Sequence, residues 1–178
     1  FGCGAIGDMA IHLMDPAFWG LKLGGKVRVS SMGPRPNPQS GPTWMITKFE
    51  FGQRGKKPPV DVFWYEGTAK PPGPVARELP MNGSLFVGEK GRIAIVHGGQ
   101  PQLLPKKTFE GFTGPKSYLP KSPGHHQQWI AACKTGSPTG SHFGYAGPFT
   151  EIVLLGNVAY RAGQTIEYDP AQMKITNV

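Results

Sequence analysis

Two carboxylates and a histidine lie close together near the start of the chain. Asp8, His12 and Asp15 are separated by four and three residues within an otherwise apolar segment. In a helix, these spacings place all three side chains on one face. A carboxylate beside an imidazole stabilises its protonated form, which suits a general base that works near neutral pH. The alternative, which spacing alone favours, is a structural role. The carboxylate would then be stabilised at the positive N-terminal end of the helix, and the histidine would lie in the core with its hydrogen bonds satisfied.

A metal site is the weaker interpretation of the same residues, because a single helix offers no ligand from a second element. The apolar residues around the three polar positions are expected to face the core. The segment is therefore predicted to be a largely buried helix that keeps one polar stripe. The flanking apolar residues are Met9, Ile11, Leu13 and Met14.

Three further residues are candidates for binding a substrate. His125 and His126 begin a predicted helix, where they either contact a substrate or remain neutral at the surface. Tyr65 ends a predicted strand beside a long loop, and it either lines a sugar pocket or packs at the edge of the core. Spacing does not separate the two interpretations for the histidines, and the core interpretation is at least as good for Tyr65.

Residues 2–7 match the G-x-G-x-x-G pattern of a dinucleotide-binding loop. Within the chain no strand precedes this match, and strands rather than a βαβ unit follow it. Asp8 would also place a negative charge where the pyrophosphate binds. We interpret the match as accidental.

Composition indicates one loop-rich globular domain. The 178 residues include 26 Gly and 19 Pro, with 38% apolar residues and a net charge of +8. The basic residues are scattered through predicted loops, which favours a solvated surface with weak attraction for anions over a nucleic-acid interface. Cys3 and Cys133 are predicted to be buried small residues rather than a disulfide or metal pair. No signal peptide or membrane-spanning run is recognised.

Periodicity and turn residues predict an α+β fold with an antiparallel or mixed sheet, because strands occur in a run rather than alternating with helices. Two long stretches, residues 66–82 and 98–122, are predicted to be loops. The predicted helices are residues 7–18, 123–134 and 148–161. The first is expected to break near Pro16, and the second to begin with Ser122 as its cap and Pro123 as its first residue. The predicted strands are 26–31, 44–51, 60–65, 84–87, 92–96, 165–168 and 173–176.

Several motifs together resemble the C-terminal domain of Gfo/Idh/MocA-type oxidoreductases. Residues 7–19 read GDMAIHLMDPAFW, which is similar to the GDMxxHxMDPxFW helix of a bacterial branch of that family. The similarity extends over essentially the whole chain. Further matching segments are residues 64–67, 85–88, 119–127, 145–148, 151–157 and 173–177.

This resemblance implies an open mixed, largely antiparallel sheet with helices packed on one face, the other face serving for homo-oligomer formation. It also implies that residues 1–178 are the substrate-binding half of an NAD(P)-dependent sugar or polyol dehydrogenase. Asp8 and His12 match a catalytic D-x-x-x-H pair, and Asp15 matches a substrate contact. The Rossmann domain, with its lysine and its NAD or NADP, would precede Phe1, so this domain alone should bind no cofactor and have no activity.

Two other functions are kept as alternatives. One is an NAD-dependent glycoside hydrolase or lyase, which would use His12 in the same way and need an additional acid for the leaving group. The other is a non-catalytic binding or oligomerisation module. The sugar, the choice between NAD and NADP, and a periplasmic or cytoplasmic location remain open, and neither a nucleic acid nor a membrane is expected as a partner.

Overall fold

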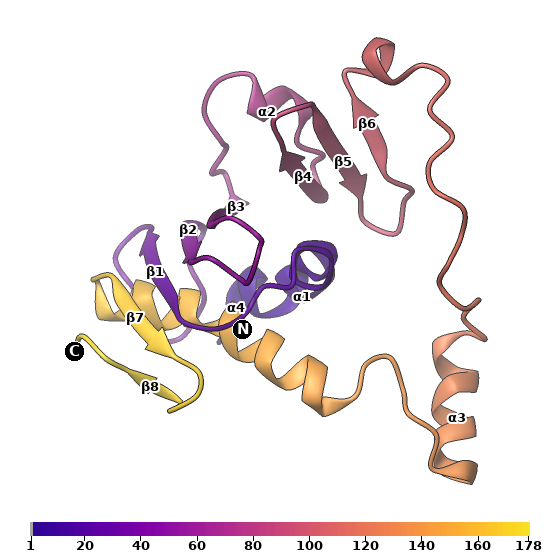
Figure 1. Ribbon diagram of the computed structural model, residues 1–178. Helices are drawn as coiled ribbons and strands as arrows, with labels where there is room; N and C mark the ends of the chain where they lie inside the picture. The colour runs from indigo at the N-terminus through magenta and orange to yellow at the C-terminus, as the bar shows by residue number, and fades with distance from the viewer. Residues whose placement is uncertain (1) are drawn as a thin grey trace.

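A five-stranded antiparallel sheet forms the central layer of the computed structural model, which describes residues 2–178 (Figure 1). Its strand order is β3-β2-β1-β7-β8. All of its strand pairs are antiparallel, so the predicted α+β fold with an open sheet is confirmed without a parallel pair among the described strands. The strands are β1 (Val27–Met32), β2 (Trp44–Phe51), β3 (Val60–Gly67), β7 (Ile166–Asp169) and β8 (Lys174–Ile175).

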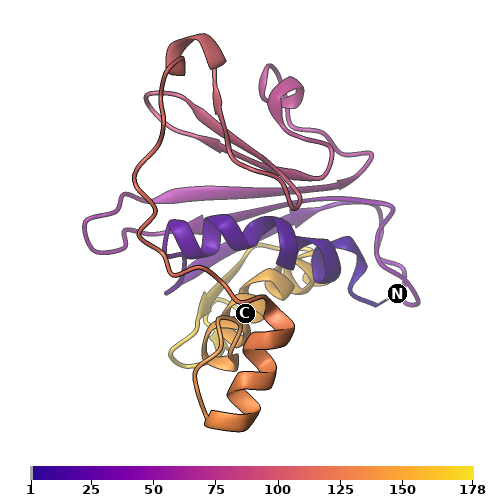
Figure 2. The same cartoon turned by 90° about the vertical axis from the view of Figure 1, so that its right-hand side faces the viewer.

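Two long helices cover one face of this sheet, as Figure 2 shows. They are α1 (Gly4–Gly20) and α4 (Phe143–Ala162). The predicted break at Pro16 and the predicted start at Pro148 are both wrong, because each proline lies inside a continuous helix. An internal proline loses a backbone hydrogen bond and costs about 3 kcal/mol. Burial of the apolar faces of both helices against the sheet offsets that cost.

The core lies between these helices and the sheet. Phe49 in β2 is fully buried and lies opposite Val29 in β1 and Val62 in β3. At Gly156, α4 comes so close to α1 and the sheet that an added Cβ would lie 2.4 Å from the Cδ1 of Ile6 in α1 and 3.1 Å from the Cγ2 of Thr47 in β2. The alternation of strand residues explains why this face of the sheet is mostly apolar, although the buried Thr47 and Glu66 also lie on it.

The opposite face of the sheet carries no helix or strand of residues 2–178. The side chains that alternation places on this face form two halves along the length of the strands. One half is charged, and Lys48 there lies 3.0 Å from a Glu50 oxygen and 2.9 Å from an Asp61 oxygen. The other half is apolar and aromatic, and it contains Met32, Trp44, Ile46, Phe63 and Tyr65.

A second, three-stranded sheet packs beside α1. It comprises β4 (Gly83–Val87), β5 (Arg92–Val96) and β6 (Gln102–Leu104), with the short helices α2 (Val75–Glu78) and η1 (Lys106–Phe109) alongside. The predicted strands 84–87 and 92–96 are confirmed as β4 and β5, which pair as an antiparallel hairpin, whereas β6, α2 and η1 lie in stretches predicted to be loops. The Ser84 hydroxyl donates to the carbonyl of Leu13 and so joins this sheet to α1.

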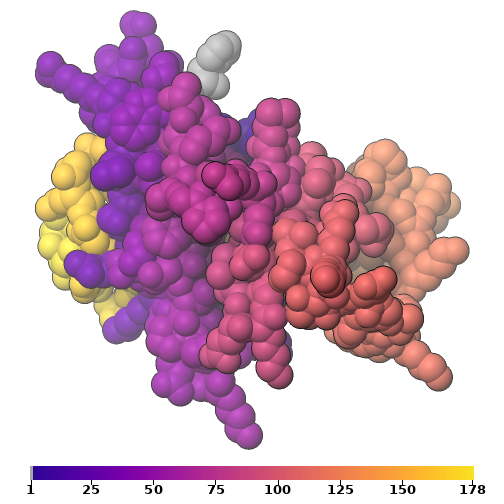
Figure 3. Space-filling model, turned by 90° about the horizontal axis from the view of Figure 1, so that it is seen from above, coloured from indigo at the N-terminus to yellow at the C-terminus, as the bar shows by residue number. Residues whose placement is uncertain are grey.

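Helix α3 (His125–Thr135) stands away from the rest of the protein (Figures 1 and 3). It has no buried residue, and Trp129 is 66% exposed. Gly136, with φ 69°, ends it in the left-handed conformation that glycine favours, close to the predicted end at residue 134. Its N-cap is Gly124 rather than Ser122, because the Ser122 hydroxyl accepts from the Gly124 N–H instead of a helical one.

Candidate functional site

Helix α1 presents the first two residues of its polar stripe to solvent. Asp8 and His12 are both exposed, while Ile6, Ala10 and Met14 on the opposite side of the helix are buried. The prediction of a largely buried helix that keeps one polar stripe is confirmed, because the flanking apolar residues lie in the core or pack against it while Asp8 and His12 are exposed. An exposed imidazole one turn from an exposed carboxylate can exchange a proton with a bound hydroxyl group.

A second histidine lies beside His12. The His97 ring centroid is 5.2 Å from that of His12, and the planes are tilted by 52°. His97 directly follows β5, and its backbone N–H donates to the Asn82 carbonyl at 2.8 Å. The sequence carries no signal for this pairing, because it arises only where the β4–β5 hairpin packs against α1.

Asp15 is held by α4. The hydroxyl of Tyr145 donates to an Asp15 carboxylate oxygen, and both side chains are half-buried. Burial, together with this hydrogen bond, raises the pKa of Tyr145 far above its usual value, so the phenol stays protonated as a donor. Asp15 therefore helps to join α1 and α4, and only part of its hydrogen-bonding capacity is available to a substrate.

The other predicted site residues lie elsewhere. The rings of His125 and His126 are 4.1 Å apart, and both residues are exposed at the start of α3. Tyr65 lies on the uncovered face of the sheet, stacked on Phe63 at 6.2 Å, and partial burial raises its pKa. The structure thus brings together Asp8, His12 and Asp15 on α1 and places the remaining three candidates at two separate locations.

The residue after Tyr65 has a structural role that the sequence did not indicate. Glu66 is buried, and one carboxylate oxygen accepts from the Trp64 indole N–H at 2.6 Å. Burial raises the pKa of Glu66, while hydrogen bonds from Trp64 and from the backbone N–H of Ile6 oppose that rise. The N-cap residue of α1, Cys3, provides no side-chain hydrogen bond, so Glu66 caps this helix from β3.

Replacing Glu66 should weaken the attachment of α1 to β3. Glu66→Ala leaves two buried N–H donors unpaired and should lower the free energy of unfolding by about 2–3 kcal/mol. Glu66→Gln keeps one acceptor oxygen and should cost about half as much. Denaturant unfolding of both variants measures the difference, and equal losses would contradict the capping role.

The same carboxyl group predicts a pH dependence. The folded-state pKa of Glu66 is raised above its unfolded value, so its contribution to stability is fully present below the unfolded pKa. That contribution is lost as pH rises through the folded pKa. The stability of the wild type relative to Glu66→Gln should therefore fall as pH increases above about 4.5 and then level off. A pH-independent difference would contradict this assignment.

Residues 2–7 do not form a dinucleotide-binding loop. Gly4 and Gly7 of the G-x-G-x-x-G match already lie within α1, so no glycine-rich loop forms there. No group of three metal-ligating side chains gathers within residues 2–178. None of the helices in that range combines the length and apolar character required to cross a bilayer. Both cysteines, predicted to be buried, are exposed thiols, because neither α3 nor the start of α1 is covered on that side.

Comparison with known proteins does not assign this sequence to a family. No family model matches the sequence, and no curated protein matches it. The assignment of a function therefore rests on the motifs and on the geometry of α1.

Proposed function

We propose that this chain is the substrate-binding and catalytic-base half of an NAD(P)-dependent sugar or polyol dehydrogenase. The observation that carries the proposal is the exposed pair Asp8 and His12 on one face of α1. This pair occurs within the segment 7–19 that resembles the Gfo/Idh/MocA family. A merely structural pair would more often be covered or paired within the fold.

In this proposal His12 accepts the hydroxyl proton while the carbon–oxygen bond of the substrate becomes a carbonyl. The hydride that leaves the same carbon needs an acceptor, which the nicotinamide of NAD or NADP supplies when a Rossmann domain binds it. Asp8 stabilises the imidazolium that forms on His12. Asp15, fixed by Tyr145, positions a neighbouring hydroxyl of the substrate.

The uncovered surfaces support a role within a larger assembly. Trp19, on the same side of α1 as His12, is 60% exposed, and Trp129 and Ile130 of α3 are also exposed. These side chains are available to contact a Rossmann domain. The apolar half of the uncovered sheet face is available for pairing with a second copy, in agreement with the proposed homo-oligomer.

Assays of the complete protein test this function. It should reduce NAD or NADP when supplied with a panel of sugars and polyols, followed by absorbance of the reduced nicotinamide, and residues 1–178 alone should not. Release of the leaving group from glycosides, without net cofactor reduction, would identify a hydrolase or lyase instead. A complete protein that binds neither NAD nor NADP would refute the proposal.

A further inference from the structure

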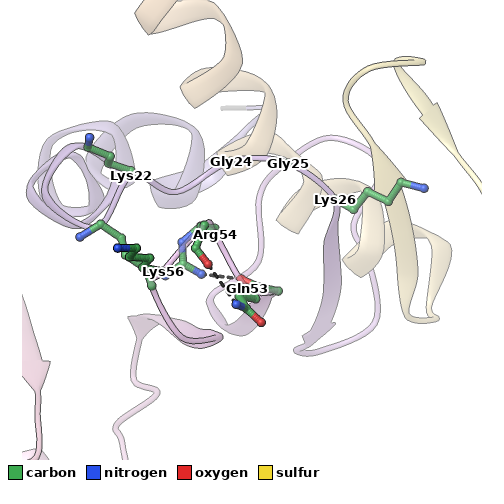
Figure 4. Close-up of a pocket in the computed structure, with 10 residues that line it drawn as sticks. Lys22, Gly24, Gly25, Lys26, Gln53, Arg54 and Lys56 are labelled. Carbon is green, nitrogen blue, oxygen red and sulfur yellow. Dashed lines mark hydrogen bonds between the residues drawn. The ribbon is translucent and has the colours of Figure 1, made fainter.

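A cationic pocket lies at the far end of α1 from Asp8. The segment joining α1 to β1 and the turn joining β2 to β3 border an open surface depression of about 790 Å³ (Figure 4). None of the described lining residues is acidic, and half of them are basic. The basic lining residues are Lys22, Lys26, Arg54, Lys56 and Lys57.

Most of these charges are not neutralised by the protein. Lys26 forms an ion pair with Asp169 at 3.2 Å, and Figure 4 shows its side chain pointing away from the others. Lys22, Lys56 and Lys57 have no carboxylate within ion-pair distance among residues 2–178. Like charges held together without a counterion repel one another, and an anion bound between them removes that cost.

The turn that carries two of these lysines is fixed in place. The backbone N–H groups of Arg54 and Lys57 each donate to the carbonyl of the other residue, at 3.1 and 3.0 Å. The Arg54 guanidinium donates to the Gly52 carbonyl at 2.6 Å and to the Leu21 carbonyl at 3.4 Å. Arg54 thus connects the turn to the end of α1 and holds both walls of the pocket together.

Lys22 occupies a backbone conformation that normally favours glycine. It follows the end of α1 with φ 52°, in the left-handed region. A residue with a Cβ is less stable there than glycine by about 1 kcal/mol. Stability alone would therefore favour a glycine, and the presence of a lysine indicates a use for its side chain.

We propose that this pocket binds a small molecule that carries two or more phosphate or sulfate groups. Its volume lies within the range of small-molecule sites, about 300–1,000 Å³. Several lysine side chains without an ion-pair partner suit a ligand with several oxyanion groups better than a ligand with one. A nucleic acid would instead need a basic surface that extends along its backbone. Lys22 lies roughly 15 Å beyond His12 along the helix axis, so this inference does not depend on the proposed dehydrogenase function.

Calorimetric titration of the protein with tripolyphosphate and with sucrose octasulfate tests the proposal and distinguishes a phosphorylated from a sulfated ligand. The double variant Lys56→Gln, Lys57→Gln should raise the Kd at least about tenfold, since two charge-assisted contacts are lost. The matched control Lys106→Gln, Lys107→Gln changes the net charge equally at an exposed lysine pair outside the pocket. It should change the Kd less than about twofold.

Lys22→Gly separates binding from folding. It should weaken binding severalfold while leaving the Tm unchanged or higher, because glycine relieves the backbone cost. Equal losses of affinity in the two double-lysine variants would show only a general attraction to positive charge and would overturn the proposal. The absence of binding by both probes, or binding of RNA alone, would overturn it as well.

Discussion

In the complete protein, His12→Ala is expected to lower kcat by about a thousandfold, within the range of roughly 10²–10⁴ that general acid–base catalysis contributes. The side chain is exposed, so its removal should change the free energy of unfolding by less than about 0.5 kcal/mol. Activity and denaturant unfolding of the same preparation therefore separate a catalytic role from a structural one.

His142→Ala is a suitable control for this change. His142 is an exposed histidine before α4 and forms no side-chain cap hydrogen bond. Its replacement should leave kcat essentially unchanged. If His12→Ala also leaves turnover intact, the non-catalytic module becomes the better interpretation of the fold.

Gly67→Ala should be among the most destabilising single substitutions in the protein, at about 3 kcal/mol or more. Gly67 ends β3 with φ 65°, which alone costs an alanine about 1 kcal/mol. Its added Cβ would also lie 2.0 Å from the carbonyl oxygen of Thr43, a backbone atom that cannot rotate away. Relief of this contact requires the β2–β3 pair to shift.

Gly98→Ala isolates the backbone contribution. Gly98 has φ 69°, nearly the same conformation, but no atom beyond its chain neighbours lies within 4 Å of its added Cβ. It should lose only about 1 kcal/mol in denaturant unfolding. Similar losses for the two variants would show that the Thr43 contact contributes little.

The strands of the central sheet were predictable because most of them bury one face. The alternating pattern of residues 44–51 predicts the observed bounds of β2. The uninterrupted helix through Pro16 was not predictable, because the packing that compensates for the proline involves distant residues. Strand β6 was missed for a similar reason: its three residues gain strand structure only by pairing with β5.

The candidate site was predictable only within a single element. Helical spacing correctly placed Asp8, His12 and Asp15 along α1 and directed the apolar residues around them to the core, but it could not indicate which distant residues would lie beside them. The proximity of His97 to His12 and the hydrogen bond from Tyr145 to Asp15 both join residues far apart in the sequence. Such contacts depend on tertiary packing, which local patterns do not specify.

The isolation of α3 divides the chain into parts that need not unfold together. An 11-residue helix is too short to be stable alone in water, and α3 buries no side chain that would compensate. Its opening therefore costs little free energy and leaves the core intact, whereas opening α4 requires loss of the whole core. Residues 125–135 thus act as a separate, weakly cooperative unit whose helical state is set by what it contacts.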